Sequence, residues 1–411
     1  MTAPTLGRGP GSASTIVAAT VAAGVAGYLV TVLAKRELGD GYALFAIFWA
    51  ALYLVVGGLS GIQQVVTRAT RPIGTRTRTT NTARNFALAG GVAVLVAIVS
   101  TSPVWSAAVF SGDGWLLVLP LAVGASSYVL VATLSGSLFG VSQWRSIAIL
   151  IAVDGLLRLA LVAVGLFATD DIVVIAWLVA APFPITLLIA WPIIRRSFVG
   201  TSDLDVGYRA LSWNVLRTVF ASVSAAVLVS GFPLLLGVVS EGVSARELGE
   251  YIFVITLTRA PLIVTVMALQ GFLVVRFRDR PDHWLRFFLS VQGVLLLGAA
   301  VLSALAWWLG PPVFELVSGD PVTLDGGVMA LLVISSALVG ALSVSGAAVL
   351  ARADHFAYSV GWVVAAVVTV VVIALPVDFA TRVQWALVAG PVAGLVVHLA
   401  WLFGRRSTTA R

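Results

Sequence analysis

Long apolar segments separated by short polar ones run along almost the whole chain. Twelve of these segments are apolar over about 20 residues, the length of helix that crosses a hydrocarbon core about 30 Å thick. This pattern predicts an all-α polytopic membrane protein with about 12 transmembrane helices. The segments cover residues 14–34, 42–62, 86–108, 115–140, 147–168, 173–194, 211–236, 250–273, 285–309, 327–350, 356–376 and 383–403.

Short motifs recur about 210 residues apart. The stretch "RELGDGY" at Arg36–Tyr42 returns as "RELGEY" at Arg246–Tyr251, and four further matches follow in the same order, each shifted by 207 to 210 residues. Because glycine readily takes the left-handed conformation that ends a helix, we expect Gly39 and Gly249 to end a helix in the two turns. The repetition indicates two halves of six helices each.

Six is an even number, so both halves enter the membrane from the same side and form a parallel repeat, as in some secondary transporters. We therefore predict an N-terminal six-helix lobe over residues 14–200 and a C-terminal six-helix lobe over residues 201–404. A flexible cytoplasmic leader is expected over residues 1–13, and a basic cytoplasmic tail over residues 405–411.

The distribution of charge gives the predicted helices an orientation. Charged residues make up 10% of the chain, against roughly 25% in soluble domains. Eighteen of the 25 Lys and Arg residues fall on one predicted side of the membrane, and only Lys35, Arg36, Arg246 and Arg382 fall on the other. Cytoplasmic loops carry the excess of positive charge. We therefore predict the cytoplasmic (inner) membrane, with both termini cytoplasmic, and no nucleic-acid partner despite the pI of about 10.3.

Several kinds of chemistry are excluded or disfavoured. The chain has no cysteine, which rules out disulfides and thiolate metal sites. His283, His355 and His398 have no metal-ligand spacing, and no loop exceeds about 20 residues, which leaves no room for a soluble catalytic domain. A P-loop is absent too, so any energy is expected from an ion or proton gradient or from consumption of the product. We expect no metal, no other cofactor and no enzymatic activity.

Two stretches resemble a known family. "LAKRELGDGYALFAIFWAALYLVVGGLSGIQQVVTR" (Leu33–Arg68) is similar to the first hairpin of the polysaccharide and oligosaccharidyl-lipid flippases. These belong to the multidrug/oligosaccharidyl-lipid/polysaccharide (MOP) exporter superfamily. "LTRAPLIVTVMALQGFL" (Leu257–Leu273) is similar to their eighth helix. The resemblance implies a MOP/MATE-like fold and a role in cell-envelope polysaccharide biosynthesis. The lipid II flippase branch usually has fourteen helices, whereas this chain has twelve predicted spans.

Four ionisable side chains fall inside predicted spans, where a charge is costly and marks a functional candidate. Asp154 and Arg158 are four residues apart on one helix face. We expect them to form either a self-neutralising pair or a site that binds substrate or protons. Arg217 either snorkels to the interface or widens a polar entrance together with Asn214. Arg259 is expected either to contact cargo or to form an ion pair with another helix, for example with Asp154.

The four charges sum to +2, and a guanidinium suits phosphate oxygens. The residues therefore favour an alternating-access flippase for a polyprenyl-diphosphate-linked oligosaccharide or a related anionic glycolipid. Arg259 and Arg158 are the leading substrate contacts, followed by Arg217 and Asn214, and Asp154 is an ion-coupling residue or a structural partner. The expected partners are membrane lipids, the glycolipid itself, and envelope glycosyltransferases or a polymerase.

Two other classes stay open. A small-molecule or multidrug antiporter, MATE-like or of the major facilitator type, is the first. Exporters of cationic drugs would be expected to carry unpaired membrane carboxylates, and the loop that a major facilitator marks with an acid has none here. A membrane glycosyltransferase or polymerase is the second, and it needs outward carboxylates in a sizeable loop. "TDDI" at Thr169–Ile172 has the carboxylates in a loop of a few residues, and a solvated helix cap is the expected structure there.

Overall fold

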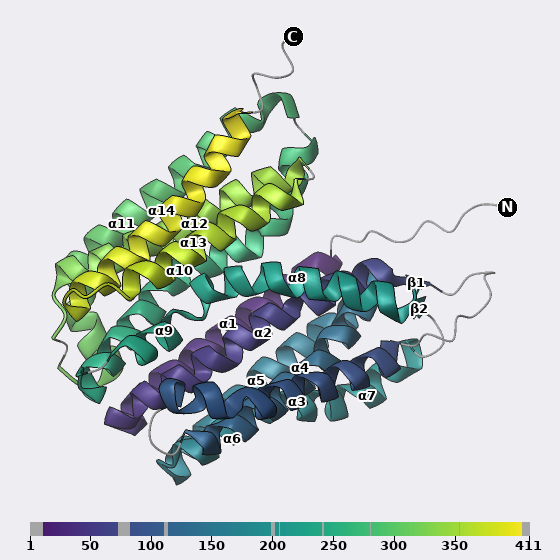
Figure 1. Cartoon of the computed structure of the whole chain (residues 1–411), viewed down its shortest axis with the longest axis horizontal. Helices are drawn as coiled ribbons and strands as arrows, with labels where there is room; N and C mark the ends of the chain where they lie inside the picture. The colour runs from purple at the N-terminus through teal and green to yellow at the C-terminus, as the bar shows by residue number, and fades with distance from the viewer. Residues whose placement is uncertain are drawn as a thin grey trace. The chain divides into compact units, whose positions relative to one another are not determined.

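The computed structural model describes residues 11–72, 83–110, 114–198, 202–204, 206–240, 242–279, 281–321, 323–352 and 354–404. These residues are almost entirely helical (Figure 1). Two 3-10 turns, η1 (Gly39–Gly41) and η2 (Pro281–His283), and two short strands, β1 (Thr70–Pro72) and β2 (Ser202–Leu204), complete the elements. The helices are α1 (Gly11–Leu38), α2 (Tyr42–Ala69), α3 (Ala83–Phe110), α4 (Trp115–Gly140), α5 (Trp144–Ala168), α6 (Ile172–Ala180), α7 (Pro182–Phe198), α8 (Tyr208–Val229), α9 (Phe232–Val239), α10 (Ala245–Asp279), α11 (Trp284–Ser318), α12 (Gly326–Ala351), α13 (His355–Ile373) and α14 (Phe379–Gly404).

The predicted all-α membrane architecture is confirmed. Each of the 12 predicted spans lies on one helix, except that the sixth is divided into α6 and α7, the seventh is divided into α8 and α9, and the eleventh extends three residues beyond α13. Ten segments of the described chain are long and apolar enough to cross a membrane, and one of them, Thr15–Ala69, contains both α1 and α2. The predicted leader lies outside the described residues as far as residue 10, and so does the whole tail, residues 405–411.

The chain forms two compact units. Unit 1 comprises Met1–Leu33, Leu59–Ser106 and Asp113–Val219, and unit 2 comprises Ala34–Gly58, Ala107–Gly112 and Phe220–Arg411. Part of the first hairpin therefore groups with the second half of the sequence. The two predicted lobes, which follow the sequence repeat, stay a prediction.

Unit 1 is organised around α4 and α5. Both pack against α6 and α7 (Figure 1). Glycine permits a close approach of α4 to the end of α2, because a methyl group on Gly136 would lie 2.7 Å from the carbonyl oxygen of Gln63. Strands β1 and β2 pair antiparallel, with Thr70 opposite Leu204. This pairing ties the end of α2 to the segment that precedes α8.

Unit 2 is built around α12, which packs against α10, α11 and α14, while α13 packs against α14. Most of α12 is small or apolar, and four of its serines, Ser335, Ser336, Ser343 and Ser345, are buried with their hydroxyls bonded to backbone carbonyls one turn earlier. Such local bonds satisfy hydroxyl donors in a helix that cannot reach water. Helix α12 can therefore be surrounded by other helices on several sides.

Glycines also explain how α2 packs on α8. Within unit 2, a methyl group on Gly57 would lie 2.8 Å from the Cβ atom of Ala226. Within unit 1, one on Gly61 would lie 2.8 Å from the backbone nitrogen of Val219. Small residues at this spacing allow two helix backbones to approach closely.

The expectation for the two glycine turns is half correct. Gly39 has a φ of 52°, in the left-handed region, at the turn between α1 and α2. Gly249, in contrast, lies inside α10, and the left-handed residue before that helix is Gly242, with a φ of 83°. The second helix of the C-terminal half begins earlier than the repeat indicates.

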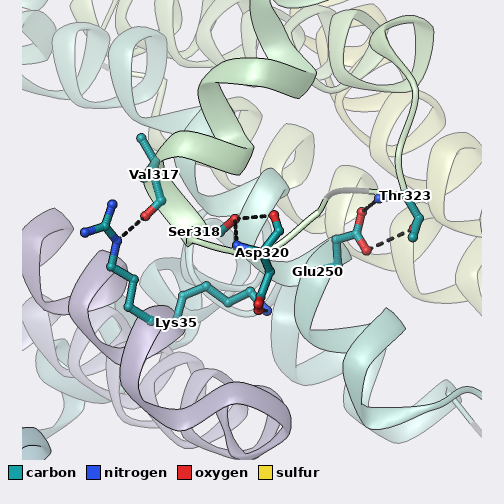
Figure 2. Close-up of polar contacts among 7 residues, drawn as sticks. Lys35, Glu250, Val317, Ser318, Asp320 and Thr323 are labelled. Carbon is teal, nitrogen blue, oxygen red and sulfur yellow. Dashed lines mark hydrogen bonds and ion pairs between the residues drawn. The ribbon is translucent and has the colours of Figure 1, made fainter.

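A polar cluster joins elements at one end of unit 2, which charge predicts to be the outer end (Figure 2). The Nζ atom of Lys35 lies 3.7 Å from Asp320. Arg36 donates from Nε to the carbonyl of Val317 over 2.8 Å, in the last turn of α11. A cation at a helix C-terminus is favourable because that end carries partial negative charge. The end of α1 is thereby held to the loop between α11 and α12.

Glu250 makes the second part of this cluster. Its carboxylate accepts hydrogen bonds from the backbone N–H and the hydroxyl of Thr323 (Figure 2). It also accepts one from the backbone N–H of Leu324. Although Glu250 is buried, its charge is therefore solvated by three donors. The start of α10 is fixed to the segment that leads into α12.

Candidate functional site

Arg158 and Asp154 form the ion pair that their spacing in α5 predicts. The guanidinium donates from Nη1 to Oδ2 over 2.7 Å and from Nη2 to Oδ1 over 2.8 Å. This bidentate geometry is the strongest arrangement for an arginine and a carboxylate. Arg158 is only 5% exposed, so the pair neutralises a charge that lies inside unit 1.

The same guanidinium also caps a broken helix. Arg158 donates from Nε to the carbonyl oxygen of Val179 over 3.2 Å, at the end of α6. Its Cζ atom lies 4.6 Å from the ring centroid of Phe183, at the start of α7. Pro182 and Pro184 lack the N–H that continues a helix, which explains why α6 stops there. Arg158 therefore supplies a donor to one of the carbonyls that the end of a helix leaves without an intrahelical partner.

Arg259 has the equivalent position at the other broken helix. It is 7% exposed in α10, and its Nη1 donates to the carbonyl oxygen of Leu228 over 2.9 Å, at the end of α8. Its Cζ atom lies 5.2 Å from the ring centroid of Phe232, the first residue of α9. Gly231 is the N-cap of α9 and Pro233 follows Phe232, so the sequence again interrupts the helix where the arginine reaches it.

The two arrangements share one spacing. In each, the arginine donates to a carbonyl and lies over a phenylalanine four residues further along the broken helix: Val179 and Phe183 in unit 1, Leu228 and Phe232 in unit 2. An unsatisfied backbone group in lipid costs several kcal/mol, and irregular backbone survives at membrane depth only where partners satisfy it. Each arginine thus has a structural role that its sequence position alone does not show.

Arg217 and Asn214 lie in a different environment. Both are exposed on α8, and the Cζ atom of Arg217 lies 4.7 Å from the ring centroid of Trp213, which is also exposed. A hollow of about 880 Å³ lies beside the first turns of α8, and neither Arg217 nor Asn214 is among its described lining residues. In the part of the chain that the structure describes, its lining consists of Gly207, Arg209, Ala210, Ser212, Trp213 and Leu216.

The sequence-predicted site residues thus fall into three places. The structure brings Asp154 and Arg158 together, sets Arg259 at the break between α8 and α9, and leaves Arg217 and Asn214 on the surface of α8. Sequence reasoning missed the two phenylalanines, Arg209 and Trp213. The signals "PFP" at Pro182–Pro184 and "FP" at Phe232–Pro233 were present but did not by themselves identify a break.

One smaller expectation is also tested. Asp171, in the "TDDI" loop, is the N-cap of α6, and its side chain accepts a hydrogen bond from Val173 N–H over 2.8 Å. The predicted helix cap is therefore confirmed. Within the described ranges, no group of three or more His, Asp or Glu side chains is placed to hold a metal ion.

Comparison with solved structures shows the fold. The lipid II flippase MurJ, in an inward closed conformation, matches with a TM-score of 0.70 at 12% identity, over 94% of this chain and 87% of that one. An inward-facing multidrug resistance MATE transporter of the MOP superfamily matches with a TM-score of 0.68 at 15% identity, over 97% and 100%. A MOP superfamily transporter from Pyrococcus furiosus, described by a binding pocket of reverse polarity, has a TM-score of 0.65 at 14% identity, over 97% and 96%.

Comparison of sequences gives nearer relatives, although no protein-family profile matches the chain. The uncharacterized protein Mb3654 of Mycobacterium bovis is 32% identical over 397 residues, which cover 95% of this chain and 91% of the relative. The uncharacterized protein Rv1510 of Mycobacterium tuberculosis is 33% identical over 411 residues, which cover 98% and 94%. The chain therefore belongs to the family of Mb3654 and Rv1510, and it is a multi-pass membrane protein with the fold of the MOP superfamily transporters.

Proposed function

We propose that this protein is an alternating-access flippase that moves a polyprenyl-diphosphate-linked oligosaccharide, or a related anionic glycolipid, outward across the cytoplasmic membrane. The cargo would serve the synthesis of a cell-envelope polysaccharide, and both termini would lie in the cytoplasm. Membrane lipids and the envelope glycosyltransferases or polymerase that make and use the cargo are its proposed partners. The fold, shared with a flippase and with exporters, supports transport as the general activity.

The main support for an anionic cargo is the buried guanidinium of Arg259 at the break between α8 and α9. Its bond to the Leu228 carbonyl and the Phe232 ring hold the guanidinium in one position. A planar guanidinium binds phosphate oxygens through paired N–H donors, and a water-poor environment strengthens the attraction. A diphosphate brings several such oxygens with its negative charge. We assign Arg259 as the principal cargo contact.

Arg158 is the second proposed contact. Its charge is balanced by Asp154, and this carboxylate weakens its attraction for an anion. The acid that a cationic-drug exporter would use is likewise engaged, since both oxygens of Asp154 accept from Arg158. This argues for an anionic cargo over a cationic one. Arg217 and Asn214, which are exposed on α8, are proposed to meet the cargo before the buried arginines do.

The test begins with cells depleted of this protein. We expect mass spectrometry to show accumulation of one polyprenyl-diphosphate glycan, whose sugars would name the cargo. Complementation with Arg259→Ala should reproduce the accumulation while a normally inserted protein remains, because the proposed cargo contact is lost. A matched control is Arg278→Ala, which removes an arginine from the exposed ion pair of α10 and should restore the wild-type lipid pool.

A second outcome would redirect the proposal. If the polyprenyl-linked pool stays unchanged on depletion, the glycolipid is not the cargo, and export of small molecules becomes the function to test. Formation of new glycosidic bonds by the purified protein would instead indicate a transferase or polymerase.

A further inference from the structure

A buried histidine connects three helices of unit 2. His398, in α14, is completely buried. Its Nδ1 atom lies 2.9 Å from the hydroxyl of Ser345 in α12, and its Nε2 atom lies 3.2 Å from the carbonyl oxygen of Tyr358 in α13. The Tyr358 ring stacks on the imidazole, with the two ring planes 13° apart. One imidazole therefore bonds to both neighbouring helices.

The surrounding helices are shaped to this ring. A methyl group in place of hydrogen on Gly361 would overlap the imidazole, and one on Gly346 would lie 3.4 Å from its Cε1 atom and 3.0 Å from the Tyr358 ring. A third glycine, Gly394, lies one turn before His398, where a methyl group would meet the backbone oxygen of Gly361 at 2.5 Å. The space between α12, α13 and α14 fits an imidazole closely.

Counting donors and acceptors shows how protons are distributed at this site. The Tyr358 carbonyl can only accept a hydrogen bond, so Nε2 carries a proton. The hydroxyl of Ser345 lies 2.8 Å from the carbonyl of Leu342, which also only accepts. When the imidazole is neutral, the single hydroxyl proton faces two acceptors, Nδ1 and the Leu342 carbonyl, and can serve one of them.

Protonation removes this conflict. With a proton on Nδ1, the imidazolium donates to the Ser345 oxygen, and the hydroxyl donates to Leu342, while Nε2 continues to donate to Tyr358. All three bonds are then made at once. The neutral form avoids burying a charge, and the charged form completes the hydrogen bonds, so the two forms compete. Rotation of one hydroxyl is the only rearrangement that the change requires.

We propose that His398 is a proton-binding site, and that its protonation couples a proton gradient to transport. The proton comes from hydronium: the Nδ1 lone pair forms the new N–H bond, water leaves, and the imidazole becomes a cation. The link to transport rests on the function proposed above, whereas proton binding itself does not. Asp154, the other candidate for coupling, is already engaged by Arg158.

Charged groups near one end of unit 2 indicate where the proton would arrive. Asp354 is the N-cap of α13, one turn before Tyr358, and it accepts a hydrogen bond over 2.7 Å from Trp401, three residues after His398. Its negative charge favours the imidazolium. Arg352, after α12, opposes it, although its guanidinium is held by the Leu402 carbonyl and lies over the Trp284 ring. The exposed His355 begins α13 at this end, which is predicted to be cytoplasmic.

The helices around this site carry other titratable groups. Besides the phenol of Tyr358, those described on α10, α11 and α14 stand toward the ends of these helices, apart from Arg259 within α10, and no described bond joins any of them to the imidazole. They are Arg246, Glu247, Glu250, Tyr251, Arg276, Arg278, Asp279, Arg286, Glu315 and Arg382.

The composition of the chain permits a direct test. It contains only three histidines, so nitrogen-15 labelling of histidine in the full-length protein in lipid nanodiscs should give three sets of imidazole signals. The set that disappears in His398→Gln identifies the site. We expect this set to change reversibly from an Nε2-protonated neutral ring to an imidazolium as the pH is lowered from about 8 to about 5, bracketing the ordinary histidine value. Ser345→Ala should shift the midpoint of His398 and leave the signals of His283 and His355 in place.

The opposite result is equally clear. If His398 stays a single neutral tautomer at every pH at which the protein remains folded, it only joins helices, and the proposal is wrong. A His398 midpoint unchanged in Ser345→Ala would also contradict it, because the serine would then not exchange its hydrogen bond. Should His398→Gln fail to fold, the less disruptive Ser345→Ala still decides the question.

Coupling is tested separately in proteoliposomes with a short-chain polyprenyl-diphosphate saccharide as the probe. An imposed pH gradient should accelerate flipping by the wild-type protein several-fold, and His398→Gln should abolish the acceleration while exchange without a gradient continues. Gradient-driven flipping that persists in His398→Gln would overturn the coupling. If the wild-type protein does not flip the saccharide at all, the proposed cargo is wrong. The titration of His398 is decided separately by the nitrogen-15 measurement.

Discussion

The two broken helices of this protein are capped by the same arrangement but with different charge. Arg158 and Arg259 each donate to a carbonyl at the end of a helix and lie over a phenylalanine four residues later. Arg158 has a bidentate carboxylate partner in Asp154, whereas the bond described for Arg259 goes to a neutral carbonyl. The described contacts of this cap thus include an ion pair in unit 1 and a backbone carbonyl and an aromatic ring in unit 2.

The likeness is not inherited from the sequence repeat. Arg158 lies in the fifth span of the first half and Arg259 in the second span of the second half, so the repeat does not align them. Both arginines instead donate to the carbonyl at a helix end, because a helix that stops inside a membrane leaves carbonyls without donors. A long side chain with several N–H groups can reach such a carbonyl from another helix and retain donors for a ligand.

The largest loss of stability is expected from breaking the ion pair of Asp154 and Arg158. Asp154→Asn should destabilise the protein by about 3–5 kcal/mol, because it leaves the charge of Arg158 buried without its carboxylate. The midpoint of thermal unfolding in detergent measures this loss. The double variant Asp154→Asn/Arg158→Gln should recover part of the stability, since neither charge is then buried.

The control for this prediction is the exposed ion pair of Arg278 and Asp279, whose side chains are 66% and 55% exposed. Asp279→Asn should cost less than about 1 kcal/mol, as exposed pairs do. If the double variant at Asp154 and Arg158 is no more stable than the single one, charge balance is not the role of Asp154.

Substitution of the other arginine should separate function from stability. Arg259→Lys keeps a positive charge but loses the planar fork that binds phosphate oxygens. We expect a several-fold loss of flipping with a stability loss of about 1–3 kcal/mol from the weakened bond to Leu228. Flipping in proteoliposomes and thermal unfolding are measured on the same preparation. Equal flipping by the wild type and Arg259→Lys would show that charge alone is sufficient.

The two phenylalanines offer a smaller and more symmetrical test. Phe183→Leu and Phe232→Leu keep an apolar side chain but remove the ring face that attracts the guanidinium. Each should destabilise the protein by about 0.5–2 kcal/mol, the range of a cation–π interaction. Similar values for the two would support a common design. A loss at only one site would mean that the other ring serves packing.

The smallest change in stability is expected at the exposed N-terminal cap of α14. Asp378 is the N-terminal neighbour of α14, and its side chain accepts a hydrogen bond from Thr381 N–H over 2.9 Å. This bond lowers the pKa of the exposed carboxyl below its ordinary value. Its stabilisation is therefore present above the unfolded-state pKa and is lost as the pH falls through the lower, folded-state pKa. We expect Asp378→Asn to remove a slight acid-dependent change in the unfolding midpoint below about pH 4. An unchanged acid profile would contradict this assignment.

Much of the architecture follows from the sequence because its causes are local. Twelve apolar segments predicted the spans, and the spacing of Asp154 and Arg158 predicted their pair. The breaks were not predicted, since proline alone does not locate them: Pro103, Pro120 and Pro391 lie inside continuous helices. Whether a proline ends a membrane helix depends on whether neighbouring groups satisfy the freed carbonyls.

The partners of those carbonyls are distant in the sequence. Arg259 bonds to Leu228, 31 residues earlier, and this contact exists only once α8 and α10 have packed. His398 was set aside from sequence because no metal-ligand partner accompanied it, and Ser345, its actual partner, is 53 residues away. The misplaced turn at Gly249 has a different cause, since the repeat preserves the residues of the motif but not the start of the helix.

The cluster around Lys35 and Asp320 restricts how proteins of this family can diverge. Lys35 and Arg36 come from the first half of the repeat, and the groups that hold them come from the second half. Mutations at the two places are therefore expected to be accepted together. A chimera that joins the first half of this chain to the second half of a mycobacterial relative would separate Lys35 and Arg36 from the groups that bind them here. The contact therefore predicts that the two halves, although they share a sequence repeat, are not exchangeable modules.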